Sequence, residues 1–231
     1  MSEAALREAE REAILEAAPF ALAVTLVLAL LAAVSAQADW KLFDGMGWWL
    51  WAVTAGVWGL LALVLLLGLG GMVPGRHDAR RRVAQVLLGA VVAFSLVQTA
   101  LLIASLVAAG TQVTGAQLLQ TGATLWLANV VAFGLAFWEL DCGGPVSRAL
   151  AKHRTRPDFS FPQDADPELA RPDWEPHLGD YLYVALTNSI AFSPTDTMPL
   201  TRPAKGLMGL ESAVSVVALL LVAARAINIL A

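Results

Sequence analysis

The side chains that could bind or pass a small ion gather in the last quarter of the chain. Thr187, Asn188 and Ser189 carry hydroxyl and amide groups in a short apolar stretch, residues 181–192, and a polar kink follows at residues 193–196. About a dozen apolar residues are too few to cross a bilayer of roughly 30 Å, which takes about 20 residues in a helix. Irregular backbone at membrane depth is tolerated only where protein or a water-filled cavity satisfies its N–H and C=O groups. The pattern therefore predicts a re-entrant loop at a pathway or binding site.

Composition identifies the chain as an integral membrane protein. Hydrophobic residues make up 58% and charged residues 15%, whereas a soluble domain has about 25% charged residues. The formal net charge is -4, and no extended basic surface suggests a nucleic-acid partner. Cys142 is the only cysteine and the three histidines lie far apart, so we expect no metal site. Without paired carboxylates, a Ser–His arrangement or a phosphate-binding loop, we expect neither an enzyme nor a bound cofactor.

Five stretches are long and apolar enough to span the lipid bilayer: residues 19–37, 47–69, 83–109, 118–139 and 207–230. The predicted fold is all-α, a polytopic membrane protein with five transmembrane helices and one re-entrant, pore-like half-helix before the last span. We expect an N-terminal surface helix over residues 1–17 and a four-helix transmembrane region over residues 18–140. A polar, proline-rich linker over residues 141–179 then leads to the re-entrant loop and last span, residues 180–231.

Basic residues mark one side of the membrane. They follow the second and fourth spans, as Arg76, Arg80, Arg81, Arg82, Arg148, Lys152, Arg154, Arg156 and Arg171. The first connection offers only Lys41 and the third none, so the positive-inside rule predicts a cytoplasmic N-terminus. Interfacial anchors are predicted at Trp48, Trp49 and Trp51 near the start of the second span and at Trp138 at the end of the fourth.

The linker between the fourth and fifth spans is the only sizeable polar stretch of the sequence. It contains Pro162, Pro167, Pro172 and Pro176, a density that opposes regular helices and central strands. We expect it to lie along the membrane face, with one short basic helix over residues 146–153. Its acidic residues are expected to be solvated.

The final segment resembles a known pore domain. The run Y-L-Y-V-A-L-T-N-S-I-A-F-S from Tyr181, followed by D-T-M-P from Asp196, is similar to the pore helix, filter and exit turn of the two-helix potassium-channel pore domain, T-L-T-T-V-G-Y-G-D-x-x-P. Thr201, Lys205 and Arg225 also fall where that pattern often has Thr and Arg. The resemblance covers residues 180–228 and lies in order and spacing more than in identity. As a whole, the chain is similar to an uncharacterised family of five-span bacterial membrane proteins, which implies the bacterial inner membrane.

The resemblance implies a set of site residues. The pore-like loop would comprise Thr187, Asn188, Ser189, Ile190, Ala191, Phe192, Ser193 and Asp196, and the inner helix would contribute Glu211, Ser215 and Arg225. Where potassium channels have Gly-Tyr-Gly, this chain has Ala191-Phe192-Ser193, and Ser215 replaces a hinge glycine. Glycine adopts the torsion angles of that filter without strain, whereas Ala and Ser do not. We expect Glu211 to pair locally or with the turn at Asp196.

Two functions remain open on the sequence. One loop and one inner helix do not enclose a pore, so an ion-channel-like function requires a homo-oligomer, a tetramer by analogy, with a monovalent ion as the permeant species. The alternative is a non-conducting accessory or binding subunit that keeps a pore-domain skeleton. Potassium channels place this loop outside the cell, whereas the basic connections place it in the cytoplasm. We keep the orientation that the charges predict.

Overall fold

The computed structural model describes residues 3–37, 47–69, 77–107, 115–151, 157–166, 168, 174–193 and 196–230. Its longer helices are α1 (Glu3–Gln37), α2 (Gly47–Leu69), α3 (His77–Val107), α4 (Gly115–Leu140), α7 (Leu178–Ala191) and α8 (Arg202–Leu230). Between α4 and α7 lie the 3₁₀ turn η1 (Asp141–Gly143), α5 (Pro145–Leu150), β1 (Phe159–Ser160) and α6 (Pro162–Ala165), and β2 (Met198–Pro199) precedes α8. The described chain is mostly helical, as the sequence predicts.

Three helical stretches are long and apolar enough to cross a membrane. They are Ala4–Gln37, Leu119–Leu150 and Arg202–Leu220. Within their described parts, α2 and α3 carry the shorter apolar stretches Leu50–Val64 and Gln85–Leu101. The predicted class of helical membrane protein agrees with these lengths.

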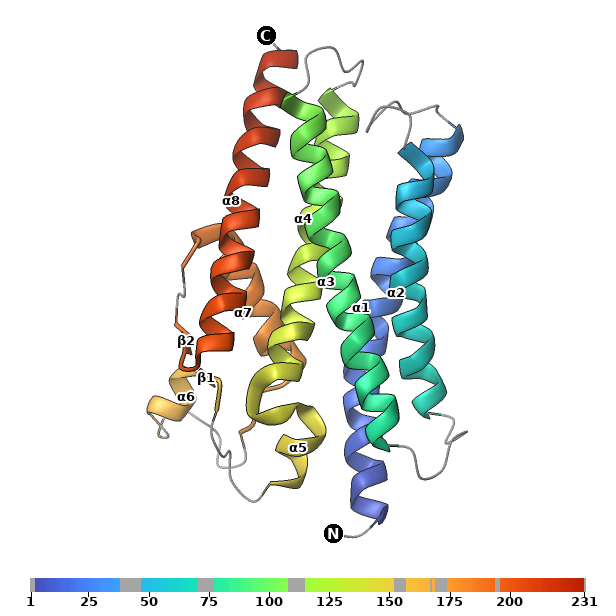
Figure 1. The fold of residues 1–231 in the computed structure, drawn as a ribbon. Coiled ribbons are helices and arrows are strands. Elements are labelled where there is room, and N and C mark those ends of the chain that lie inside the picture. The colour runs from blue at the N-terminus through green and yellow to red at the C-terminus, as the bar shows by residue number, and fades with distance from the viewer. Residues whose placement is uncertain are drawn as a thin grey trace.

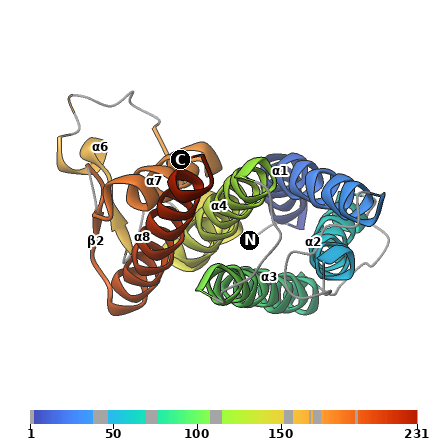
Figure 2. The same ribbon diagram turned by 90° about the horizontal axis from the view of Figure 1, so that it is seen from above.

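The long helices form a bundle in which α1 to α4 run alternately in opposite directions, whereas α7 and α8 both run away from the end that carries the N-terminus (Figure 1). In Figure 2, α4 lies between α1 and the pair α7 and α8, α3 runs along one side, and α2 pairs with α1. The N-terminus, the start of α3 and the short elements after α4 all lie toward one end of the bundle. The described basic residues of the first turns of α3 and of α5 therefore lie toward the end that carries the N-terminus.

The first helix is longer than expected. The sequence predicts a separate surface helix over residues 1–17, but α1 runs without a break for 35 residues and contains Pro19. A proline inside a helix lacks the N–H that would bond to the carbonyl of Leu15. Ala17 and Ala21, on either side of the proline, are buried in the core, so packing holds this stretch helical despite the lost bond.

Two of the predicted interfacial tryptophans lie inside the protein. Trp48 is 55% exposed, but Trp51 is 1% and Trp138 is 5% exposed, so the prediction of anchors is wrong for these two. Trp51 and Trp58 are seven residues apart, which puts them on the same face of α2, where both are buried in the core. Their large rings fill the interior of the bundle.

The connection after α4 folds against the bundle and is not a solvated linker. Phe159 and Phe161 are buried, and their ring centroids lie 6.1 Å and 5.4 Å from that of Tyr181, both edge-on. The strands β1 and β2 pair antiparallel, with Phe159 opposite Pro199. Of the predicted basic helix over residues 146–153, α5 covers the part up to Leu150, and the backbone is extended at Ala151. Residues 152 and 153 lie outside the described residues.

A buried charge pair holds this connection in place. Asp141 accepts hydrogen bonds at Oδ1 from the amides of Asp158 (2.7 Å) and Phe159 (3.2 Å), and at Oδ2 from the hydroxyl of Tyr181 (2.5 Å). The Nη1 of Arg148 donates to the carbonyl oxygens of Trp138 and Asp141, each at 2.7 Å. One carboxylate therefore joins the end of α4 to β1 and α7.

Candidate functional site

Helix α7 is only about half as long as a membrane span. Its 14 residues rise about 21 Å, against the roughly 30 Å of a hydrocarbon core. Two carboxylates accept hydrogen bonds from the amides at its start. Asp180 Oδ2 accepts from the amide of His177 (2.8 Å), and Glu16 Oε2 accepts from the amide of Leu178 (3.2 Å). At the other end Phe192 adopts a left-handed conformation, φ 55°, and its amide donates to the Asn188 carbonyl (3.0 Å). This geometry stops the helix.

Beyond α7 the described chain returns toward the end of the bundle from which α7 began (Figure 1). It resumes at Asp196 and pairs through β2 with β1. The Leu200 amide donates to the Asp158 carbonyl (2.8 Å) and the Thr201 hydroxyl to Asp158 Oδ1 (2.5 Å), just before α8 begins. The chain thus rises through part of the bundle as a helix and comes back beside the start of α8.

The helix extends further into the predicted filter than the sequence suggests. In the predicted pore-like loop, Ile190 to Ser193 would have irregular backbone and turn their carbonyl oxygens toward the pore. In the structure, Ile190 and Ala191 are helical. Without the conformational freedom of glycine at these positions, the helix continues until Phe192. Thr187 is helical too, and its hydroxyl donates to the carbonyl of Tyr183 (2.9 Å). Of residues 187–193 in the predicted pore-like loop, only Phe192 and Ser193 lie outside the helix.

The tip of this element is accessible in the single chain. Ile190 is 55% and Phe192 is 41% exposed, and Ala191, Ser193 and Asp196 are also exposed. Asp196 accepts a hydrogen bond from its neighbour Thr197 at 3.4 Å. Two large apolar side chains thus face outward beside a polar turn.

Asn188 connects α7 to α8. Its Nδ2 donates to Glu211 Oε2 (2.7 Å) and to the Met208 carbonyl (2.9 Å), and its Oδ1 accepts from the Ser212 hydroxyl (3.0 Å). Glu211 therefore pairs with the half-helix and not with the turn at Asp196, contrary to expectation. Asn188 and Glu211 are 1% and 0% exposed, so this amide–carboxylate bond lies in the interior.

The other face of α7 packs closely on α4. Trp126 donates from Nε1 to the Ser189 hydroxyl (3.1 Å), which itself donates to the Leu186 carbonyl (2.8 Å). A Cβ added at Gly134 would lie 2.7 Å from Leu182 Cδ2 and 3.1 Å from its Cα. Glycine at 134 therefore allows the two helices to approach.

The inner-helix residues differ in their surroundings. Glu211 Oε1 and the hydroxyl of Ser215, one turn later on α8, are buried and have no hydrogen-bond partner among the described residues. Asn129 Oδ1, on the adjoining α4, is likewise buried without a described partner, although its Nδ2 donates to Thr99 (3.3 Å). Arg225 lies in α8, and its side chain is outside the described part. Charged groups inside a span cost roughly 2.5 to 3.5 kcal/mol on insertion scales, so Glu211 is an unusual residue to bury there.

Sequence reasoning singled out Asn188 and Glu211, although not as partners, and missed the contacts of Asp141, Arg148 and Tyr181. An ionisable residue within an apolar run stands out in a sequence, whereas Asp141 sits beside polar residues at the end of a span. The one available signal was Gly143-Gly144 directly after it, since both have positive φ (77° and 96°) and turn the chain back. Among the described residues, no three His, Cys, Asp or Glu side chains are grouped to hold a metal ion.

Comparison with protein-family models, curated proteins and solved structures finds no match to this chain. Arguments about its function therefore start from the residues and their geometry.

Proposed function

We propose that the chain is an ion-channel-like protein of the bacterial inner membrane, in which several copies form a pore for a small monovalent cation at the 187–196 loop. The observation that carries this proposal is the half-length helix α7, tied at its start to Glu16 and Asp180 and along its length to Glu211. In this proposal α2 and α3 span the bilayer as well, which makes five spans, and α7 is re-entrant. The N-terminus and both basic connections then face the cytoplasm.

The charge of the permeant ion follows from the end of α7. A helix C-terminus carries a partial negative charge equivalent to roughly half an electron, from carbonyls without helical partners. The exposed tip at Ile190 to Ser193 presents this end. The negative end of the helix favours a cation over an anion.

Apolar exposure at the tip and along the returning segment supports assembly of several copies. Ile190 and Phe192 are exposed at the tip, and Met198 (58% exposed) and Leu200 (48% exposed) lie in the segment that leads back to the start of α8. Contact with neighbouring copies around a shared axis would remove these side chains from water and bring the tips together. A tetramer is the assembly that the likeness to potassium channels suggests.

Ion flux into liposomes tests the proposal. Purified wild-type protein should conduct potassium or sodium, and Ala191→Trp should abolish the flux, because its indole would fill the space between facing tips. Ala191 is exposed in the single chain, so the variant should fold and keep its oligomer size. Leu26→Trp, at a 69% exposed position on α1, is the matched control and should conduct normally. Flux that persists in Ala191→Trp would place the pathway elsewhere.

One observation favours the non-conducting alternative. The carbonyls of Ile190 and Ala191 belong to a helix, so they do not line a filter in the way that potassium channels require. If well-folded oligomeric wild type passes no potassium, sodium, proton or chloride at any voltage applied, the protein is an accessory or binding subunit.

A further inference from the structure

Three buried oxygen atoms inside the bundle have no hydrogen-bond partner among the described residues. They are Glu211 Oε1 and Ser215 Oγ on α8 and Asn129 Oδ1 on α4. The three residues are 0%, 2% and 4% exposed, and they lie within the apolar stretches Arg202–Leu220 and Leu119–Leu150. An unpartnered polar atom in the interior costs free energy unless water or an ion satisfies it, so these oxygens indicate a bound occupant.

Hydrogen bonds to α7 place the oxygens at a similar depth. Trp126 of α4 donates to the Ser189 hydroxyl (3.1 Å), and the neighbouring Asn188 donates to Glu211 of α8 (2.7 Å). The turn of α4 that holds Trp126 and the turn of α8 that holds Glu211 therefore lie beside the same turn of α7. Asn129 follows Trp126 by three residues, a rise of about 4.5 Å along the helix.

The directions of α4 and α8 bring the side chains closer together. These helices pack against each other, and α4 runs toward the end that carries the N-terminus whereas α8 runs away from it (Figure 1). Glu211 and Ser215 are one turn apart on the same face of α8. Because side chains lean toward the N-terminus of their own helix, Asn129 leans away from that end of the bundle and Ser215 leans toward it. The two side chains approach each other at the level of Glu211.

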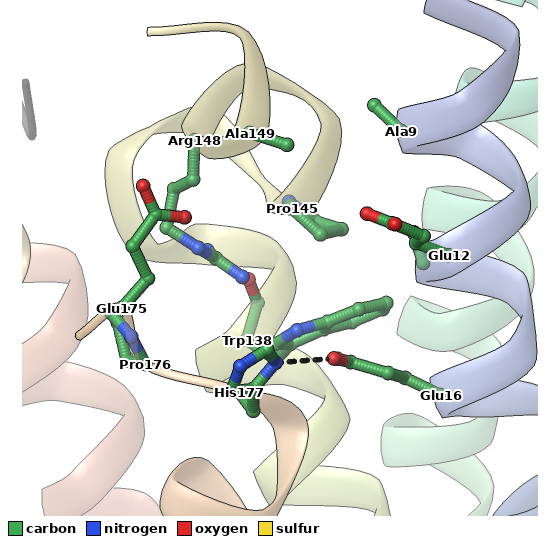
Figure 3. A pocket seen from close by; sticks show the side chains of 11 residues that line it. Ala9, Glu12, Glu16, Trp138, Pro145, Arg148, Ala149, Glu175, Pro176 and His177 are labelled. Carbon is green, nitrogen blue, oxygen red and sulfur yellow. Dashed lines mark hydrogen bonds and ion pairs between the residues drawn. The ribbon is translucent and has the colours of Figure 1, made fainter. Parts of the chain in front are cut away.

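The carboxylate at the start of α7 shows what a satisfied pairing looks like. Glu16 Oε1 lies 2.6 Å from Nδ1 of His177 (Figure 3), and Glu16 Oε2 accepts the amide of Leu178 (3.2 Å). Glu211 uses only one oxygen, and its partner Asn188 is a neutral amide, which does not balance the charge of an ionised carboxylate. Ionisable residues within a span pair with an opposite charge or face an ion pathway, so the site at Glu211 suits a cation.

We propose that Glu211 Oε1, Ser215 Oγ and Asn129 Oδ1 bind one monovalent cation, sodium or potassium, between α4 and α8. A carboxylate, a hydroxyl and an amide carbonyl are oxygen ligands of the kind that hard cations prefer. The single carboxylate balances one positive charge, and no three His, Cys, Asp or Glu side chains are grouped among the described residues to hold a more highly charged metal ion. Water is the competing occupant, since it satisfies the oxygens but leaves the charge of Glu211 unbalanced.

This site is separate from the proposed pore. It lies inside each copy of the chain, whereas the pore lies between copies at the tip of α7, so cation binding suits a channel and a non-conducting binding subunit alike. A protein that binds the cation but passes no ion would contradict the proposed function alone. A protein that conducts without any stabilisation by cations would contradict this site alone.

Thermal unfolding of the full-length protein in detergent tests the site. Sodium chloride or potassium chloride should raise the melting temperature saturably, because a ligand that binds only the folded state stabilises it. N-methylglucamine chloride at the same ionic strength should not, since its cation is too large to fit between two packed helices. The alkali cation that saturates at the lower concentration is the preferred ion.

Three variants locate the binding. Glu211→Gln removes the charge with little change of shape and should abolish the cation-dependent shift. Ser215→Ala removes one ligand and should raise the half-saturating concentration about tenfold. Ser35→Ala is the matched control, because Ser35 Oγ on α1 is also buried without a described partner, and this variant should respond to cations as wild type does.

Two results would overturn the proposal. Equal melting temperatures of wild type in all three salts would leave water as the occupant. A saturable shift that stays unchanged in both Glu211→Gln and Ser215→Ala would place the cation at another site.

Discussion

Two buried carboxylates in this protein are satisfied to different degrees. Asp141 accepts two amides and a hydroxyl, whereas Glu211 accepts one amide donor through Oε2 and leaves Oε1 without a described partner. A fully satisfied buried network rigidifies a fold, but an unsatisfied acceptor in the interior costs free energy. Asp141 therefore contributes a well-satisfied network to the fold, whereas Glu211 leaves part of its hydrogen-bonding capacity unused.

The bond between Asn188 and Glu211 should be measurable as stability. We expect Glu211→Ala to lower the free energy of unfolding by about 1 to 3 kcal/mol, because the Asn188 amide loses its buried acceptor. The measurement is thermal or denaturant unfolding in detergent. Asp196→Ala should change stability by less than about 0.5 kcal/mol, since Asp196 lies exposed on the turn.

A double variant separates pairing from packing. Replacing both groups by apolar side chains of similar size, as in Asn188→Leu with Glu211→Leu, removes donor and acceptor together, so it should cost less than the sum of the single changes. Strict additivity would show that the two residues do not interact in solution.

The sequence reveals which polar residues are unusual but not their partners. Glu211 stands out within an apolar run, yet its partner depends on how α7 and α8 align, and the turn at Asp196 is closer in sequence than Asn188. The tryptophans show the same limit. Trp48 and Trp51 look alike as residues near the start of a span, but only the packing of α1 on α2 decides that Trp51 is buried.

At the scale of elements, the contact between α4 and α7 depends on one glycine. Gly134→Ala would place a Cβ 3.1 Å from the backbone of Leu182, so α7 must shift or the side chain of Leu182 must change rotamer. We expect a loss of about 1 to 3 kcal/mol, the usual cost of overpacking, measured by unfolding in detergent.

Gly89→Ala is the matched control for that change. Gly89 is also helical, but a Cβ there meets nothing within 4 Å, so alanine should leave stability unchanged or raise it by up to about 1 kcal/mol. Equal destabilisation by both substitutions would show that the α4–α7 contact is looser than the structure indicates.

Element boundaries were predictable where a single physical signal dominates. The apolar stretch 181–192 nearly coincides with α7. A helix in the interior needs apolar side chains to pack, and these stop at the polar kink after residue 192. The fold of the linker was not predictable, because Phe159 and Phe161 are isolated in a polar, proline-rich sequence. Their burial depends on Tyr181 and β2, which are distant in the chain.

For the whole molecule, the arrangement of helices ties the orientation of α7 to that of the N-terminus. The end of α2, the start of α3, the elements after α4 and the start of α7 lie toward the same end as the N-terminus (Figure 1). If that end is cytoplasmic, as the basic residues predict, the half-helix enters from the cytoplasm, opposite to the ordinary potassium-channel pore domain.

Labelling of single cysteines in intact cells decides between the two orientations. In a chain with Cys142→Ser, we expect Arg80→Cys and Lys152→Cys to resist a membrane-impermeant maleimide until the cells are permeabilised, because both basic connections face the cytoplasm. Thr111→Cys, between the third and fourth predicted spans and therefore expected outside the cell, is the matched position and should react at once. The reverse pattern would mean that α7 enters the membrane from outside the cell. The basic residues would then lie outside the cell as well, against the positive-inside rule. Equal reactivity at all three positions would contradict a bundle that spans the membrane with its two ends in different compartments.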